Sequence, residues 1–119
     1  LGDTVGRGDP DRIDAMLGAV LGELPPSRLA GHFHDTGGRA VENIEASLAR
    51  GLRVFDASVG GLGGCPYAPG AKGNVATEKV HDRLRALGYE TRLDEAALLE
   101  AALFARSLRA QEPRGGKDV

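Results

Sequence analysis

The chain has 119 residues, of which 41% are hydrophobic and 27% are charged, and its formal net charge is −2. This length allows one domain at most, and the composition suits a soluble globular protein rather than a disordered one. Charges of both signs are interspersed and no apolar run approaches the roughly 20 residues that span a bilayer, so we expect no nucleic-acid partner and no membrane partner. Cys65 is the only cysteine, which excludes an internal disulfide and favours a cytoplasmic location.

Hydrophobic periodicity and turn residues divide the chain into alternating strands and helices. Because it begins at Leu1, within what resembles the end of a strand, we expect the chain to be part of a longer protein. Asp9 and Pro10 predict the start of a first helix, and Pro25 and Pro26 predict its end. The later elements are expected as a strand over 29–34, a helix over 38–50, a strand over 52–58, a glycine-rich loop over 59–73, helices over 75–87 and 95–110, and a polar tail over 111–119.

This alternation of strands and helices predicts right-handed βαβ units and a parallel sheet. Two or three short apolar strands make an incomplete sheet. We therefore expect an α/β fold that forms the C-terminal portion of a (β/α)8 TIM barrel over residues 1–110, with a small three-layer α/β domain as the alternative. Helical spacing places Leu24 and Leu87 on buried faces and His81 on an exposed face.

Two histidines lie two residues apart at the end of the strand predicted over 29–34. In a strand, His32 and His34 project from the same face with Cα atoms about 6.5 to 7 Å apart, while Phe33 points the other way. Two imidazoles at this spacing can bind one cation, and sites in parallel α/β folds form at the carboxyl ends of strands. From the spacing alone, the alternative is one core histidine and one surface histidine.

The glycine-rich loop leaves the next strand at its carboxyl end, as the histidine segment does. Glycines such as Gly63 and Gly64 let the backbone approach a ligand or move as a lid. Cys65 lies among these glycines rather than on an apolar helix face, which favours a thiol that transfers a proton at carbon. An incidental exposed cysteine is the alternative.

Three further polar residues lie beside the predicted strand ends. Asn74 offers a carboxamide oxygen to a mixed nitrogen and oxygen site for Mg²⁺ or Mn²⁺, although an ordinary helix N-cap is the alternative. Glu78, one helical turn later, either orients Asn74 or faces solvent. Asp3 either accepts hydrogen bonds from substrate or from metal-bound water, or stabilises a turn.

Three stretches together resemble the C-terminal part of the 3-hydroxy-3-methylglutaryl-CoA lyase family, within the metal-dependent lyase and Claisen-synthase barrels. They are Leu-Gly-Asp-Thr at 1–4, His-Phe-His-Asp-Thr at 32–36, and the loop over 60–74 with its continuation Val-Ala-Thr-Glu. The histidine segment also occurs in similar form in carboxyltransferases and related synthases, whereas the cysteine-bearing loop is much more specific. The resemblance runs from residue 1 to about residue 109.

The resemblance implies cleavage of a 3-hydroxy-3-methylglutaryl thioester, an acyl-CoA, into acetyl-CoA and acetoacetate. It implies that His32, His34 and Asn74 bind a divalent cation, Mg²⁺ or Mn²⁺, which polarises the substrate oxygens. Cys65 would belong to the proton-transfer machinery that quenches the carbanion left by carbon–carbon cleavage, and Asp3 matches a functional aspartate of the family. A homodimer of the full-length parent is expected.

The chain departs from the family pattern in two ways that matter for activity. Gly37 and Gly38 stand where many relatives carry an aromatic residue, and the family's first-strand Arg-Asp pair is absent from these residues. We therefore expect the isolated 119 residues to be inactive and the intact parent to be the enzyme. The competing functions are a Claisen-type synthase or carboxyltransferase of the same superfamily, and a non-catalytic module that binds a metal or an anion.

Overall fold

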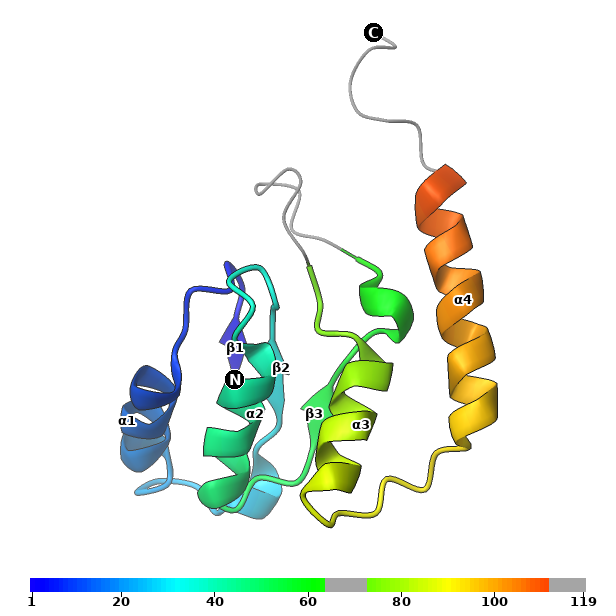
Figure 1. The fold of residues 1–119 in the computed structure, drawn as a ribbon. Coiled ribbons are helices and arrows are strands. Elements are labelled where there is room, and N and C mark those ends of the chain that lie inside the picture. The colour runs from blue at the N-terminus through cyan, green and yellow to red at the C-terminus, as the bar shows by residue number, and fades with distance from the viewer. Residues whose placement is uncertain (64–72, 112–119) are drawn as a thin grey trace, which may run out of the picture.

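The structure, a computed structural model, describes residues 1–63 and 73–111 (Figure 1). Strands and helices alternate along most of this part of the chain, as the sequence predicts. Their bounds are β1 Gly2–Asp3, α1 Pro10–Val20, β2 Gly31–Phe33, α2 Ala40–Ala49, β3 Phe55–Asp56, α3 Thr77–Ala86 and α4 Glu95–Gln111, with short 3₁₀ turns at Pro26–Arg28 and Val59–Gly61. No helix among the described residues combines the length and the apolarity that a membrane span requires.

The three strands form one parallel sheet in the order β1, β2, β3. In its register His32 lies opposite Gly2 on one side and opposite Asp56 on the other. Because the strands are parallel, their carboxyl ends meet at one edge of the sheet, where the histidine segment and the turn after β3 both begin. The prediction of a parallel α/β fold is confirmed.

The helices lie in chain order across the molecule, with α4 at the far side next to α3 (Figure 1). A hydrophobic core joins α1, α2, the sheet and α3, and its fully buried members include Leu17 of α1, Ile44 of α2, and Leu52. Phe33 is 3% exposed and packs near Phe55, with the ring centroids 6.5 Å apart. The alternation predicted for the strand therefore holds, because Phe33 enters the core while its two histidine neighbours face the other side.

Several elements end earlier than the sequence predicts. The first helix stops at Val20 rather than at the prolines, because Leu21 caps it and the backbone N–H of Gly22 turns back to the Ala19 carbonyl. Leu24 then lies outside the helix and is exposed. The strands predicted over 29–34 and 52–58 shrink to three and two paired residues. The short ladders are consistent with the small number of strands that this chain contributes to the sheet.

The face of α3 was predicted wrongly at two positions. Leu87, expected inside, is 43% exposed just beyond the last turn of α3. His81, expected on the surface, is 3% exposed, and its Nδ1 lies 2.7 Å from the hydroxyl of Thr91. The segment that links α3 to α4 supplies this polar partner, so the buried imidazole keeps a hydrogen bond.

An ion pair at the surface joins α1 to the end of α2. The Arg50 guanidinium contacts both carboxylate oxygens of Asp14, at 2.6 and 3.0 Å, and lowers the pKa of that carboxyl. Both groups are solvent-exposed, so the pair contributes little to stability. Gly51 follows with φ +98°, the left-handed conformation predicted for a residue that ends a helix.

Replacing Leu17 with alanine is expected to lower the free energy of unfolding by about 3 kcal/mol, because the side chain is fully buried between α1 and α2 and its loss leaves a cavity. Equilibrium urea titration of the intact protein that carries this chain measures the change. Leu24→Ala is the matched control, since the same truncation at an exposed site costs less than about 0.5 kcal/mol. Equal losses in the two variants would contradict this description of the core.

Candidate metal and substrate site

The two histidines of the β2 segment converge at the carboxyl edge of the sheet. The Nε2 atoms of His32 and His34 lie 3.3 Å apart, and the ring centroids are 5.3 Å apart. Two ligand atoms bound at right angles to one small cation at about 2.1 Å are separated by about 3 Å. The structure therefore brings the two predicted metal ligands together at a spacing that suits a shared cation.

An acidic residue that the sequence analysis missed orients the first imidazole. Asp56 Oδ2 lies 3.1 Å from Nδ1 of His32, across the register of β2 and β3. A carboxylate on one ring nitrogen directs the other nitrogen toward a metal and raises its basicity, an arrangement common around metal-bound histidines. The sequence alone carried no signal for this contact, because it depends on the register of β2 against β3.

The second imidazole, that of His34, is not fully hydrogen-bonded by the described residues. Nδ1 of His34 is buried and has no hydrogen-bond partner among the described residues. Its Nε2 lies 3.3 Å from Nε2 of His32, whose other ring nitrogen is held by Asp56. The chemistry of this donor pair thus fits an additional electrophilic partner, such as a divalent cation, between the rings.

Asn74 lies beside the histidine segment rather than at a helix N-cap. Its backbone forms an antiparallel bridge with His34, and α3 starts later, with Ala76 as its N-cap. The Asn74 side-chain nitrogen donates to the Leu62 carbonyl at 3.1 Å, and its backbone N–H donates to the Gly63 carbonyl at 3.0 Å. The side-chain bond fixes the amide nitrogen toward Leu62 and leaves the carboxamide oxygen as the atom that can bind a hard cation.

Asp3 ends β1 next to Phe33 of β2. Its carboxylate accepts the backbone N–H groups of Arg7 and Gly8, at 3.2 and 2.7 Å, and so holds the turn that follows the strand. The turn-stabilising function weighed from the sequence is therefore present. A direct role of Asp3 in the reaction stays a prediction.

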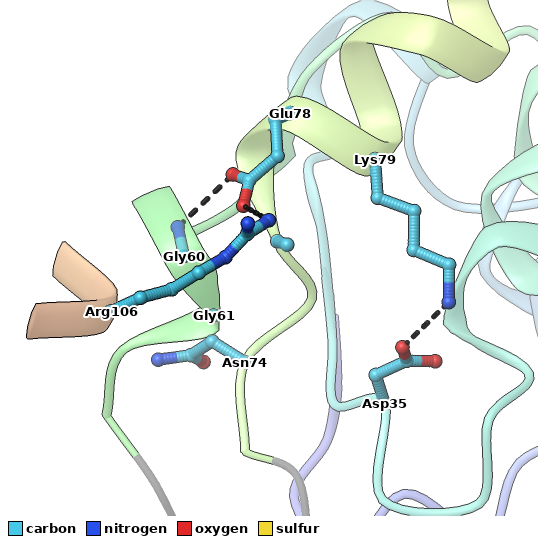
Figure 2. Close-up of a pocket in the computed structure, with 8 residues that line it drawn as sticks. Asp35, Gly60, Gly61, Asn74, Glu78, Lys79 and Arg106 are labelled. Atoms are coloured by element: carbon cyan, nitrogen blue, oxygen red, sulfur yellow. Dashed lines mark hydrogen bonds and ion pairs between the residues drawn. The ribbon is translucent and has the colours of Figure 1, made fainter. Parts of the chain in front are cut away.

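A cavity of about 200 Å³ opens at the same edge of the sheet, between the turn after β3, Asn74 and the first turn of α3 (Figure 2). Glu78 Oε2 accepts the Gly60 backbone N–H at 3.0 Å, and Oε1 lies 3.5 Å from a guanidinium nitrogen of Arg106 in α4. Glu78 is buried, so the alternative of a solvent-facing residue is wrong. Its partners lie on the turn and on α4. Its assignment as the residue that orients Asn74 directly stays a prediction.

Two of the predicted site residues, Gly64 and Cys65, lie outside the described residues, as do residues 112–119 of the tail predicted over 111–119. Gly63, the last described residue before them, has φ +85°, and a side chain at this position would meet the Asn74 amide at 2.9 Å. A glycine is therefore needed where the chain passes Asn74, while the approach of the loop backbone to a ligand stays a prediction.

A second group of potential ligands lies away from this edge. A nitrogen of His81 and carboxylate oxygens of Asp82 and Glu95 lie within 4.8 Å of one another. Both carboxylates are exposed, and His81 already bonds to Thr91. The sequence did not predict this group, because it joins two residues of α3 to the first residue of α4.

Comparison with known proteins gives consistent matches over nearly the whole chain. The family model described as HMGL-like matches residues 1–104. A hydroxymethylglutaryl-CoA lyase of Pseudomonas mevalonii is 52% identical over 103 residues, which are 87% of this chain and 34% of that protein. The crystal structure of an HMG-CoA lyase from Brucella melitensis aligns with a TM-score of 0.91 and 62% identity, over 93% of this chain and 39% of that one.

A third relative was solved with ligands. The HMG-CoA lyase of Acinetobacter baumannii, in complex with coenzyme A and 3-methylmalate, aligns with a TM-score of 0.83 and 35% identity, over 100% of this chain and 41% of that one. The chain thus spans about a third of the length of its curated relatives, for example 34% of the Pseudomonas mevalonii lyase. The likeness to these lyases confirms the predicted fold, an incomplete portion of a TIM barrel.

Proposed function

Because this chain belongs to the HMGL-like family, we propose that the protein carrying it is a divalent-cation-dependent hydroxymethylglutaryl-CoA lyase. The proposed reaction is the retro-aldol cleavage of 3-hydroxy-3-methylglutaryl-CoA to acetyl-CoA and acetoacetate. Relatives that are named for this activity and match about half of the aligned residues support the proposal.

We assign cation binding to His32, His34 and Asn74. The convergence of the two Nε2 atoms at 3.3 Å is the single observation that carries this assignment. Asp56 holds the His32 ring so that Nε2 faces the site, and the Leu62 carbonyl holds the Asn74 amide. Mg²⁺ or Mn²⁺ bound there would polarise the hydroxyl and carboxylate oxygens of the substrate.

The remaining chemistry is a proton transfer at carbon. As the C2–C3 bond breaks, a base takes the proton of the substrate hydroxyl, which becomes the ketone of acetoacetate, and the electron pair of that bond passes to the acetyl-CoA fragment. We assign Cys65 as the acid that delivers a proton to this carbanion, and Asp3 as a polar group at the same edge of the sheet. Loop glycines Gly63 and Gly64 would let the backbone close around the thioester and exclude water.

The partners and the location follow from the same proposal. The acyl-CoA substrate is the small-molecule partner, and coenzyme A is present in the structure of the Acinetobacter relative. We also propose a homodimer of the full-length protein and a cytoplasmic location. Relatives with names that specify the cytoplasm or the mitochondrion both occur, so the location is tested by fractionation.

Removal of bound metal from the intact protein is expected to abolish thioester cleavage, because the substrate oxygens then lack their electrophilic partner. Chromatographic detection of acetyl-CoA and acetoacetate, before and after chelation and after addition of Mg²⁺ or Mn²⁺, measures the effect. The proposal predicts loss and recovery of both products in equal amounts. Full activity after chelation, or release of coenzyme A without acetoacetate, would contradict it.

A further inference from the structure

Two adjacent residues in the first turn of α3 diverge toward two different sides of the cavity (Figure 2). Glu78 contacts the turn after β3 and Arg106 of α4, while the ammonium of Lys79 lies 3.0 Å from Asp35 Oδ2. The carboxylates are nearly enclosed, with side-chain exposures of 7% for Asp35 and 11% for Glu78, whereas their cationic partners are partly exposed.

The ion pair of Lys79 with Asp35 lies on the segment at the histidine side of Asn74. Asp35 directly follows His34; its Oδ1 accepts the Ala40 N–H at 3.2 Å, and its own backbone N–H donates to the Gly73 carbonyl at 2.8 Å. Gly73 is the residue before Asn74. Loss of the ammonium would leave a buried carboxylate without its cation, which favours a shift of the strand end and of the Gly73 segment bonded to it.

The ion pair of Arg106 with Glu78 contacts the segment on the other side of Asn74, the turn after β3. Gly60 has φ +66°, and a Cβ at this position would lie 2.8 Å from the Cβ of Ala105, so α4 packs directly on the turn. Glu78, which Arg106 partly neutralises, holds the Gly60 N–H. This turn leads to Leu62, whose carbonyl fixes the Asn74 amide.

We propose that Lys79 and Arg106 are positioning residues that together set the place of Asn74 relative to the histidine pair. This inference rests on the proposed function, because it concerns the cation ligand assigned there. Neither residue touches the cation or the substrate in this assignment. Lys79 acts through the carboxylate of Asp35, and Arg106 acts through the carboxylate of Glu78. Each carboxylate holds one of the two backbone segments that flank Asn74.

The test compares Mn²⁺ binding in the intact protein and in Lys79→Met and Arg106→Met, which keep the length of the side chain but remove its charge. The dissociation constant of Mn²⁺, measured by electron paramagnetic resonance of the free ion, is expected to rise about tenfold in each variant. At saturating Mn²⁺ the kcat is expected to recover most of its wild-type value. Lys79→Arg and Arg106→Lys, which restore the charge, are expected to restore the affinity.

Arg50→Met is the matched control, because it breaks an exposed ion pair between α1 and α2 that has no contact with the cavity. Its Mn²⁺ dissociation constant is expected to equal that of the wild type. The proposal would be overturned if Arg106→Met and Lys79→Met, folded as the wild type by circular dichroism, bound Mn²⁺ with dissociation constants within about twofold of the control. Arg106→Met keeps the test decisive if Lys79→Met does not fold, because the Arg106 side chain is 61% exposed.

The two proposals fail in different ways. A wild-type protein that binds Mn²⁺ but does not cleave the thioester would refute the lyase function, and the comparison of dissociation constants would still decide the positioning roles. Wild-type affinity in the Met variants of an active lyase would refute only the positioning roles.

Discussion

His34→Ala in the intact protein is expected to lower kcat/KM for thioester cleavage by about 10³-fold. Metal-ion catalysis supplies several kcal/mol of transition-state stabilisation, and each 1.36 kcal/mol corresponds to a factor of ten in rate. The variant loses one of the two imidazoles whose Nε2 atoms converge, so Mn²⁺ affinity is expected to fall in parallel. Steady-state kinetics over a range of Mn²⁺ concentrations, with and without added imidazole, measure both effects.

His81→Gln is the control for this experiment. His81 is also buried and hydrogen-bonded, but it lies on α3 and bonds to Thr91 rather than to the histidine pair. Its replacement is expected to lower thermal stability and to leave kcat/KM at saturating Mn²⁺ close to that of the wild type. Equal losses of Mn²⁺ affinity in the two variants would contradict the assignment of the site.

Cys65→Ser is expected to lower kcat by about 10² to 10⁴-fold, the usual contribution of a positioned acid or base. A serine hydroxyl is a far weaker acid than a thiol, so it delivers a proton to carbon poorly. Because Cys65 is not a proposed ligand, the dissociation constant of Mn²⁺ is expected to change little. Rapid-quench kinetics together with Mn²⁺ titration separate the two quantities.

The same variant discriminates between the lyase and its superfamily rivals. The lyase proposal assigns a proton transfer to this thiol, whereas the synthase and carboxyltransferase alternatives assign it no role, so an unchanged kcat in Cys65→Ser would contradict the lyase assignment. Cys65→Ala is the matching control for size and polarity. It is expected to lose at least as much activity as Cys65→Ser, since it has no ionisable hydrogen at this position.

Local patterns were sufficient to predict the parts of the site that depend on one segment. The two-residue spacing of His32 and His34 requires only a strand to bring both rings to one face, and the structure has that strand. The left-handed residue after α2, Gly51, follows from the same kind of local rule. The alternation of strands and helices likewise predicted the parallel sheet.

Contacts between distant segments could not be predicted in the same way. The orienting role of Asp56 depends on the register of β3 against β2, and the partners of Glu78 depend on where α4 packs. His81 was misplaced because the polar sequence of α3 concealed a second buried face, which the segment after the helix covers. Periodicity identifies an apolar face, but it does not show which loop returns to cover a polar one.

The central claim is that His32, His34 and Asn74 hold one divalent cation at the carboxyl edge of the sheet. Anomalous diffraction from Mn²⁺-loaded crystals of the intact protein tests it most directly. The account predicts a single strong anomalous peak within bonding distance of Nε2 of both histidines and of the Asn74 carboxamide oxygen. A peak at His81, Asp82 and Glu95 instead, or no peak at the histidine pair in an active crystal, would contradict it.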